Sequence, residues 1–485
     1  MIMNNKLYII ILLASSLVVH FLFFGNPREV VFDEVHYGKH VNDYINRTFH
    51  FDGHPPLARM SIAGFVKVFG YEPDSSFETI GEKYPDNQYL LLRLLPTLAG
   101  SLIPVIVFLI MLELGISPFA SFVGGLLLVF DNGLLTQSRL LLMDAFLVLY
   151  GFTSLLFYLH YKNSRKKYFL ILTGISATFA FSVKWVGLSF LGFAIIVEGL
   201  DTLAKIRNIF NFRLFNWHKV GFTILALGII PLAVYFLIIT AYSSILNRSG
   251  TGDAFMSPEY QKSIESGPYY NRTDIKPLNV FEKFYELNFK MYEVNQNLTA
   301  THPYSSPWYT WPVMERPIYY WVDSTSSPQV SGDARIYFIG NPIVWWGSTL
   351  GIIYGLWLML CWFYKKILPD KHATSSQSVM IGTLSILLMG YILNLLPFVG
   401  IKRIMFLYHY LSALIFAVII LIYIIDKHFA NWLEIRFKLQ NNSRNILWTL
   451  LILVVISFIF FAPTSYGLNL SPSAYELRLW FSSWR

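Results

Sequence analysis

Two short polar stretches near the start of the chain carry the residue types that acid–base chemistry requires. They read Phe32-Asp33-Glu34-Val35-His36-Tyr37-Gly38-Lys39 and Phe51-Asp52-Gly53-His54-Pro55-Pro56-Leu57. Both follow a hydrophobic run that ends near Gly25, which places them at the rim of a membrane, where charge is costly and usually functional. Neighbouring positions on a helix point about 100° apart, so Asp33 and Glu34 are expected to do different work. We interpret Asp33 as a base that accepts a proton from an attacking hydroxyl.

Two other interpretations of this cluster remain open at the level of sequence. In the first, Asp33 caps a helix that begins at Glu34, and both anions stabilise the positive end of its dipole. In the second, Asp33, Glu34, His36 and His54 supply oxygen and imidazole ligands to a metal ion. Their spacing matches no metal-binding motif, so we expect neither a metal site nor a cofactor.

The composition is that of a polytopic, all-α membrane protein. Of the 485 residues, 55% are hydrophobic and 14% charged, whereas a soluble domain has about 25% charged residues. The single cysteine, Cys361, excludes an internal disulfide framework. The net charge of +8 does not indicate a nucleic-acid partner, because the cations lie mainly in short loops between hydrophobic runs.

A membrane-spanning helix needs about 20 apolar residues, and the sequence offers about eleven candidate segments. They are residues 7–24, 90–112, 117–132, 140–160, 168–182, 185–200, 218–241, 343–364, 377–396, 404–425 and 446–462. We expect the first to be an uncleaved span. With eleven spans the basic loops share one side with the N-terminus, and the positive-inside rule makes that side cytoplasmic. The C-terminus and the acidic cluster then face outward.

This topology divides a single membrane domain, residues 1–485, into three notable regions. They are a first extracytoplasmic loop at 25–89, a large extracytoplasmic loop at 242–341 and a C-terminal four-helix membrane region at 342–485. In the first loop, Tyr37, Val41, Tyr44 and Ile45 recur at helical spacing, which predicts an amphipathic helix lying on the membrane surface. Pro55-Pro56 should begin the next helix.

Several cations fall on the outer side, where the positive-inside rule expects few. They are Arg93, Arg139, Lys184, Lys402 and Arg403. Each one alone is compatible with a snorkelling anchor. Together, and with His409 close behind Arg403, they indicate a site for a lipid phosphate, which such cations also stabilise as a leaving group. Asp144 has a structural alternative, which is to pair with Arg139 and hold the bundle.

The large loop contains one aromatic segment, His302-Pro303-Tyr304-Ser305-Ser306-Pro307-Trp308-Tyr309-Thr310-Trp311-Pro312. Trp and Tyr rings stack on sugar faces, and His binds hydroxyls. We therefore assign His302, Trp308 and Trp311, together with His36 and His54, to substrate or acceptor binding. The structural alternative is that these aromatic residues anchor the loop at the interface and fill its core.

Taken together, these motifs resemble the protein O-mannosyltransferases. Besides the two acidic stretches and the aromatic segment, the resemblance rests on four blocks. They are Gln137-Ser138-Arg139-Leu140-Leu141-Leu142-Met143-Asp144, Lys184-Trp185-Val186-Gly187, Gly340-Asn341-Pro342-Ile343-Val344-Trp345-Trp346 and Arg403 to Tyr410. Seven blocks in this order cover nearly the whole chain.

The resemblance implies a GT-C membrane fold and inverting transfer of mannose from polyprenyl- or dolichyl-phosphate mannose to Ser or Thr of secreted proteins. Asp33 matches the proposed base of the family, and Glu34 matches its acidic neighbour, which we assign to acceptor or sugar positioning. Arg403 and His409 match a family block, and Arg93 resembles the family's arginine near the second span. Eukaryotic members usually carry a β-trefoil MIR domain in the large loop. The loop here, about 100 residues, is too short for it, as in the prokaryotic type.

Two other functions are compatible with the sequence. A GT-C transferase can move a lipid-linked sugar onto a glycolipid or glycan, because fold does not fix the acceptor. A lipid flippase or transporter is disfavoured, because transporters place ionisable residues near the middle of the membrane and here they gather at one rim.

Overall fold

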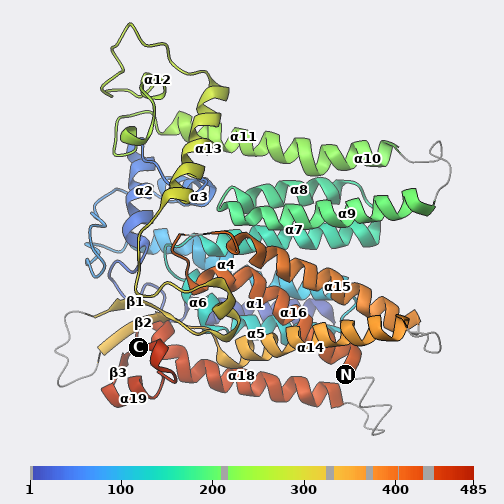
Figure 1. Ribbon diagram of the computed structural model, residues 1–485. Coiled ribbons are helices and arrows are strands. Elements are labelled where there is room, and N and C mark those ends of the chain that lie inside the picture. Colours follow the sequence, from blue (N-terminus) through green and yellow to red (C-terminus); the bar gives the residue numbers. More distant parts are fainter. Residues whose placement is uncertain (1–3, 209–216, 324–332, 368–374, 402, 430–441) are drawn as a thin grey trace.

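The computed structural model describes residues 4–208, 217–323, 333–367, 375–401, 403–429 and 442–485. Long helices lie side by side and form one bundle, with the N-terminus towards one end and the C-terminus at the other (Figure 1). The bundle helices are α1 (Asn5–Phe21), α4 (Tyr89–Glu113), α5 (Pro118–Val129), α7 (Asp144–Ser164), α8 (Tyr168–Phe181), α9 (Leu188–Asn208), α10 (Trp217–Ile224), α11 (Ile230–Ile245), α14 (Pro342–Ile367), α15 (Ser375–Leu395), α16 (Leu411–Ile424) and α18 (Asn442–Tyr466).

Each of the eleven hydrophobic segments overlaps a helix of this bundle. Among the described residues, seven helices are long and apolar enough to cross a membrane. The number rises to eight if α5 and α6 (Asn132–Ser138), which are bent by 60° at their junction, form one span. The chain is therefore a multi-pass membrane protein, whereas the count of eleven spans stays a prediction.

The most enclosed of the spanning helices is the one built on α16. In the segment Leu407–Phe429, 89% of the apolar window is buried inside the protein, compared with 33% for the segment that contains α18. Buried Gly390 of α15 lies against the Phe416 ring, where a side chain would collide with it. The first residues of this enclosed segment, which include His409, lie at the end of the bundle that carries the acidic stretch. His409 and its neighbours therefore belong to a rigid element.

The first loop forms two helices, α2 (Glu34–Asn46) and α3 (Leu57–Val68), which pack on each other at one end of the bundle (Figure 1). Helix α3 begins directly after Pro55-Pro56, as expected. The expectation that α2 lies on the membrane surface is wrong. Tyr37, Val41 and Tyr44 are buried among protein side chains, because the apolar face of α2 covers the bundle end.

The large loop adds one further long helix, α13 (Val280–Asn297), and part of a small sheet. Asn279 accepts the backbone N–H of Glu282, and the Glu282 carboxylate accepts the N–H of Asn279, so a capping box fixes where α13 begins. Strands β1 (Ile318–Val322) and β2 (Asp333–Phe338) pair antiparallel, and β3 (Asn469–Leu470) pairs with β2. The sheet brings the large loop and the C-terminal segment to the same end as α2.

Candidate active site

Asp33 stands directly before α2 in the N-cap position, but its side chain makes no capping hydrogen bond. Among the described residues, its carboxylate takes part in no hydrogen bond or ion pair. Burial raises the pKa of Asp33 from 3.8 to about 6, the Lys184 ammonium opposes the rise, and the Asp144 carboxylate adds to it. The interpretation of Asp33 as a helix cap is therefore not supported. The side chain is an unpaired carboxylate that ionises close to neutral pH.

Glu34 occupies a different environment, as its place on the helix predicts. It is completely buried, and Arg93 donates two hydrogen bonds to its carboxylate at 2.8 and 2.7 Å. The Tyr84 hydroxyl and the backbone N–H groups of Val31 and Leu141 also donate to it. Every acceptor site of Glu34 is thus used inside the protein. It holds the first loop onto the bundle, and the expectation that it positions acceptor or sugar is not supported.

Arg93 and Arg139 are likewise committed to the protein. Arg93 gives its remaining donors to the carbonyl oxygens of Gly25, Pro27 and Glu29 at 2.8–3.1 Å. Arg139 donates to the carbonyls of Phe23 and Ser465 and lies over the Tyr466 ring at 4.8 Å. Both guanidinium groups are almost fully buried. The donors of Arg93 are thus used within the protein, which does not fit its assignment to a lipid phosphate. The Nε of Arg139 has no hydrogen-bond partner among the described residues, so the assignment of Arg139 stays a prediction.

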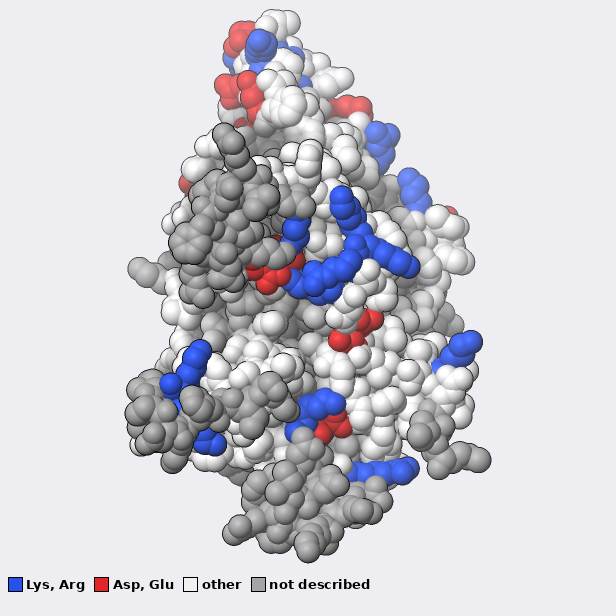
Figure 2. All heavy atoms as spheres, turned by 90° about the vertical axis from the view of Figure 1, so that its right-hand side faces the viewer, with Lys and Arg blue, Asp and Glu red and all other residues white. Residues whose placement is uncertain are grey.

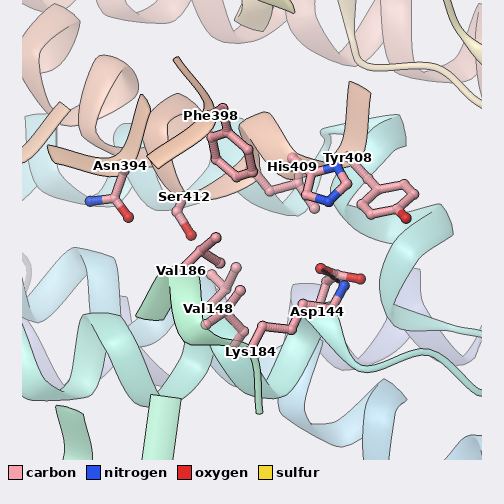
Figure 3. A pocket seen from close by; sticks show the side chains of 11 residues that line it. Asp144, Val148, Lys184, Val186, Asn394, Phe398, Tyr408, His409 and Ser412 are labelled. Atoms are coloured by element: carbon pink, nitrogen blue, oxygen red, sulfur yellow. Dashed lines mark hydrogen bonds and ion pairs between the residues drawn. The ribbon is translucent and has the colours of Figure 1, made fainter. Parts of the chain in front are cut away.

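Lys184 and Asp144 form a buried ion pair at 2.7 Å, so the structural alternative in which Asp144 pairs with Arg139 is not observed. Gln137 donates to the other Asp144 oxygen at 2.7 Å. Figure 3 shows the pair on one wall of a narrow pocket, with Tyr408 and His409 on the opposite wall. This pocket, of about 10 Å³, holds roughly one water molecule. The Lys184 ammonium group lies between the Asp144 carboxylate and the Tyr408 ring, whose centre is 5.1 Å away.

A larger cavity of about 250 Å³ adjoins this pocket and shares Lys184, Val186 and His409 with it. His54 and Arg403 also line it, together with Gly53, Trp185, Tyr292, Asn295, Gln296 and Ile401. Burial and the nearby Lys184, Arg403 and His409 hold the pKa of His54 well below its usual range. Among the described residues Arg403 makes no hydrogen bond or ion pair. Such a convergence of cationic and imidazole groups suits an anion. Lys402 lies outside the described residues.

Local hydrogen bonds position the two histidines of this cavity. The Asp52 carboxylate accepts the backbone N–H of His54 at 3.0 Å and forms an ion pair with Arg59. Arg59 also donates to the backbone carbonyl of His54 at 2.6 Å. The His409 Nδ1 lies 3.2 Å from the Phe406 nitrogen and 2.9 Å from its carbonyl oxygen. When Nδ1 accepts from the Phe406 N–H, Nε2–H remains free to donate.

The comparison with known protein families decides the identity of this fold. The model described as "Dolichyl-phosphate-mannose-protein mannosyltransferase" matches residues 10–247. The model described as "C-terminal four TMM region of protein-O-mannosyltransferase" matches residues 280–484. The chain belongs to the protein O-mannosyltransferase family.

Relatives of this mannosyltransferase family member match mainly one part of the chain. Dolichyl-phosphate-mannose–protein mannosyltransferase 4 of Candida albicans is 35% identical over 282 residues, which are 55% of this chain and 37% of that protein. Protein O-mannosyltransferase 1 of Drosophila melanogaster is 36% identical over 253 residues, which are 50% of this chain and 28% of that protein. The match thus spans about a third of the length of these curated relatives.

Solved structures show the same fold over the whole chain. The S. cerevisiae protein O-mannosyltransferase Pmt1-Pmt2 complex bound to the sugar donor superimposes with a TM-score of 0.89 at 19% identity, covering 100% of this chain and 93% of that one. ArnT from Cupriavidus metallidurans bound to undecaprenyl phosphate gives a TM-score of 0.52 at 13% identity, covering 96% and 77%. The expected GT-C membrane fold is confirmed.

Four of the other residues predicted to bind substrate or acceptor lie outside the cavity. His36 is exposed on the outer side of α2. Trp311 is fully buried, donates to Ser306 and stacks on His409, so it supports that ring and is not free to bind a sugar. Trp308 is half-buried, and His302 packs on Phe406, with ring centres 5.1 Å apart. The structural alternative therefore holds for Trp311.

Two tyrosines beside Asp33 were not predicted as site residues. The Tyr320 ring stacks on Phe32 at 4.0 Å, and its hydroxyl donates to Gln137 at 2.6 Å. Burial, together with Tyr408 and Asp33, keeps the pKa of Tyr320 well above its usual range, so the phenol stays protonated. Tyr408 belongs to the sequence block around Arg403, so it could have been predicted. Tyr320 lies on β1 in a hydrophobic run, and no motif there indicates a site residue.

The structure also bears on the metal interpretation. Within the described ranges, no three His, Cys, Asp or Glu side chains are close enough together to hold a metal ion. Of the four proposed ligands, Glu34 is bound to Arg93 and His36 is exposed, so the set is not brought together.

Proposed function

We propose that this protein transfers mannose from polyprenyl- or dolichyl-phosphate mannose to Ser or Thr hydroxyls of secreted or membrane proteins. The observation that carries the proposal is the unpaired Asp33 carboxylate beside the Lys184–Asp144 pair, whose lysine lines a cavity together with His54, Arg403 and His409. A base and an anion site next to each other are what a glycosyl phosphate donor and a hydroxyl acceptor require. Family membership supplies the sugar and the acceptor class.

The donor phosphate binds at the cationic side of the cavity. Arg403 offers a planar, unpaired guanidinium for bidentate binding, Lys184 offers a point charge, and His409 donates through Nε2. His54 is held neutral, so it acts as a hydrogen-bond partner and not as a cation. These groups stabilise the negative charge that grows on the phosphate as the glycosidic bond breaks.

The acceptor hydroxyl enters from the Asp33 side. Asp33 removes its proton while the oxygen attacks the anomeric carbon on the face opposite the phosphate. One displacement inverts the anomeric centre, so a β-linked mannosyl phosphate gives an α-linked product. The phosphate leaves as a stable anion, and no acid is needed to protonate it.

We assign the end of the bundle that carries Asp33 to the extracytoplasmic side. At the opposite end, towards which the N-terminus lies, Lys and Arg side chains are spread over the surface (Figure 2). They include Lys162, Lys219, Lys365, Lys366 and Arg444, at the ends of α7, α10, α14 and α18. The positive-inside rule makes that end cytoplasmic, which supports an outward-facing site and C-terminus.

The test is sugar transfer by the purified protein from radiolabelled polyprenyl-phosphate mannose to a Ser/Thr-rich peptide. The wild type is compared with Asp33→Asn and with Asp274→Asn, a carboxylate paired at the exposed surface. We expect transfer by the wild type and Asp274→Asn and its loss in Asp33→Asn. If the radiolabel appears in a lipid or glycan acceptor and not in the peptide, the proposed protein acceptor is wrong and the acceptor is a glycolipid or glycan.

A further inference from the structure

Helix α13 carries a stripe of aromatic side chains that nothing in the described structure covers. Phe281, Tyr285, Phe289 and Tyr292 are exposed by 69%, 69%, 48% and 54%. At 100° per residue they fall within an arc of about 80°. Large apolar patches on a surface mark a place where the protein meets something else.

The rest of the helix surface divides into two further arcs. Glu282, Glu286, Lys290 and Glu293 follow the aromatic stripe and span the next arc of about 80°. Leu287 and Met291 are buried on the remaining side, where α13 packs against the protein. The aromatic arc of α13 is therefore bordered by a charged arc, of which Glu282 is exposed and Glu286, Lys290 and Glu293 are half-buried. Such a division is typical of a helix that lies along a membrane interface.

The aromatic stripe continues the lipid-facing surface of a spanning helix. Figure 1 shows α13 crossing α11. The Phe281 ring stacks on Phe236 of α11, with centres 5.1 Å apart. On the same helix, Leu232 and Leu237 are exposed by 64% and 63%, as expected for side chains that face lipid.

The level of this contact can be placed along the membrane normal. Helices α10 and α11 belong to one span of 29 residues, Trp217–Ile245, which is about 43 Å long at 1.5 Å per residue. The hydrocarbon core is about 30 Å thick, so the helix extends about 7 Å beyond it at each end. Phe236 stands nine residues before Ile245, about 13 Å along the axis. It therefore lies about 7 Å inside the outer hydrocarbon edge.

We infer that α13 is an interfacial helix whose aromatic stripe binds the outer leaflet of the membrane at the boundary between headgroups and acyl chains. The partner is the lipid surface itself. Tyr292, the last residue of the stripe, also lines the cavity with Arg403, as do Asn295 and Gln296. The membrane-bound helix consequently holds the mouth of the cavity at headgroup depth. The inference depends on the position of α11 and not on the sugar or the acceptor.

The experiment measures the depth of nitroxide labels on α13 in lipid nanodiscs. The only cysteine is replaced by Cys361→Ser, and Tyr285→Cys and Phe289→Cys are labelled on the stripe. Glu293→Cys, whose carboxyl side chain is 43% exposed on the charged arc, is the matched control. Tyr285 is 69% exposed, so its replacement removes little buried contact. Accessibility to oxygen, which concentrates in the bilayer, is compared with accessibility to a water-soluble nickel chelate.

We expect both stripe labels to be accessible to oxygen and protected from nickel, at depths of about 5–10 Å below the phosphate level. The control label should be accessible to nickel. Stripe labels as accessible to nickel as the control would overturn the inference, because the stripe would then face water. Stripe labels protected from both reagents would also overturn it, and would identify a protein partner or a second copy of the chain as the cover.

Discussion

Replacement of Asp33 by asparagine isolates the proposed base. Asparagine keeps the shape of the side chain but cannot accept the acceptor proton. General-base catalysis contributes about 10²- to 10⁴-fold, so kcat should fall by that factor, which corresponds to about 2.7–5.5 kcal/mol of transition-state stabilisation. The KM for the lipid donor should change little, because Arg403, Lys184 and His409 are untouched.

The environment of Asp33 also predicts the pH profile. With the pKa of Asp33 raised to about 6, half of the enzyme has an ionised base at pH 6. A carboxyl with its ordinary pKa of 3.8 would be about 99% ionised there. Activity of the wild type should therefore rise between pH 5 and 7 with a midpoint near 6 and level off above 7. The measurement is kcat/KM for peptide mannosylation at saturating donor.

Stability separates loss of the base from loss of the fold. The folded-state pKa of this acid is raised by about two units, so its ionisation costs about 3 kcal/mol of folding free energy. This penalty is absent below pH 3.8, grows up to about pH 6 and is constant above it. Asp33→Asn avoids it, so its melting temperature at pH 7.5 should equal or exceed that of the wild type. Activity within tenfold of wild type, or a profile flat down to pH 5, would refute the assignment of Asp33 as base.

Three further substitutions test the remaining parts of the site. Glu34→Gln leaves a buried guanidinium without its anion, which costs about 3–5 kcal/mol; thermal unfolding should show a lower melting temperature, and an unchanged one would contradict the structural role. Arg403→Ala should raise the KM for the donor about 10- to 150-fold through loss of a charge-assisted phosphate contact, with Arg272→Ala at the surface as control. Asp144→Asn removes an anion that adds to the raised pKa of Asp33. The midpoint of the rise in activity with pH should therefore move below pH 6. A midpoint above 6 would show that Lys184 had been displaced from the site.

Removal of divalent metal is the fifth perturbation. The proposed mechanism uses only protein side chains and the leaving phosphate, so peptide mannosylation by the wild type should be the same with and without EDTA. Loss of transfer in EDTA that is restored by added Mg²⁺ or Mn²⁺ would show that a metal ion shares the phosphate with Arg403.

Several features of the site were predictable because they depend on local patterns. The Pro55-Pro56 pair correctly predicted where α3 begins. The change from apolar to acidic residues predicted that Asp33 lies at the rim of the bundle. The same local patterns failed for α2. Its apolar spacing is correct, but an amphipathic face can cover either lipid or protein, and only the packing of α2 on the bundle end shows that it covers protein.

The sequence by itself determined the class of molecule. Hydropathy, the segregation of basic loops and the order of seven motif blocks are properties of neighbouring residues, and they were sufficient to predict a multi-pass membrane protein of this family with the GT-C fold. They also singled out Asp33, Lys184, Arg403 and His409 as candidate site residues, because charge at a membrane rim is rare enough to be informative.

Only the tertiary structure decided which charges are free and which are paired. Asp33 and Glu34 are adjacent in sequence, yet one is unpaired and the other receives hydrogen bonds from Arg93 and Leu141, 59 and 107 residues away. Ion pairing depends on which side chains the packing buries together, and sequence spacing carries no record of it. For the same reason, only the packing of α13 against α11 shows that the described residues leave its aromatic stripe exposed.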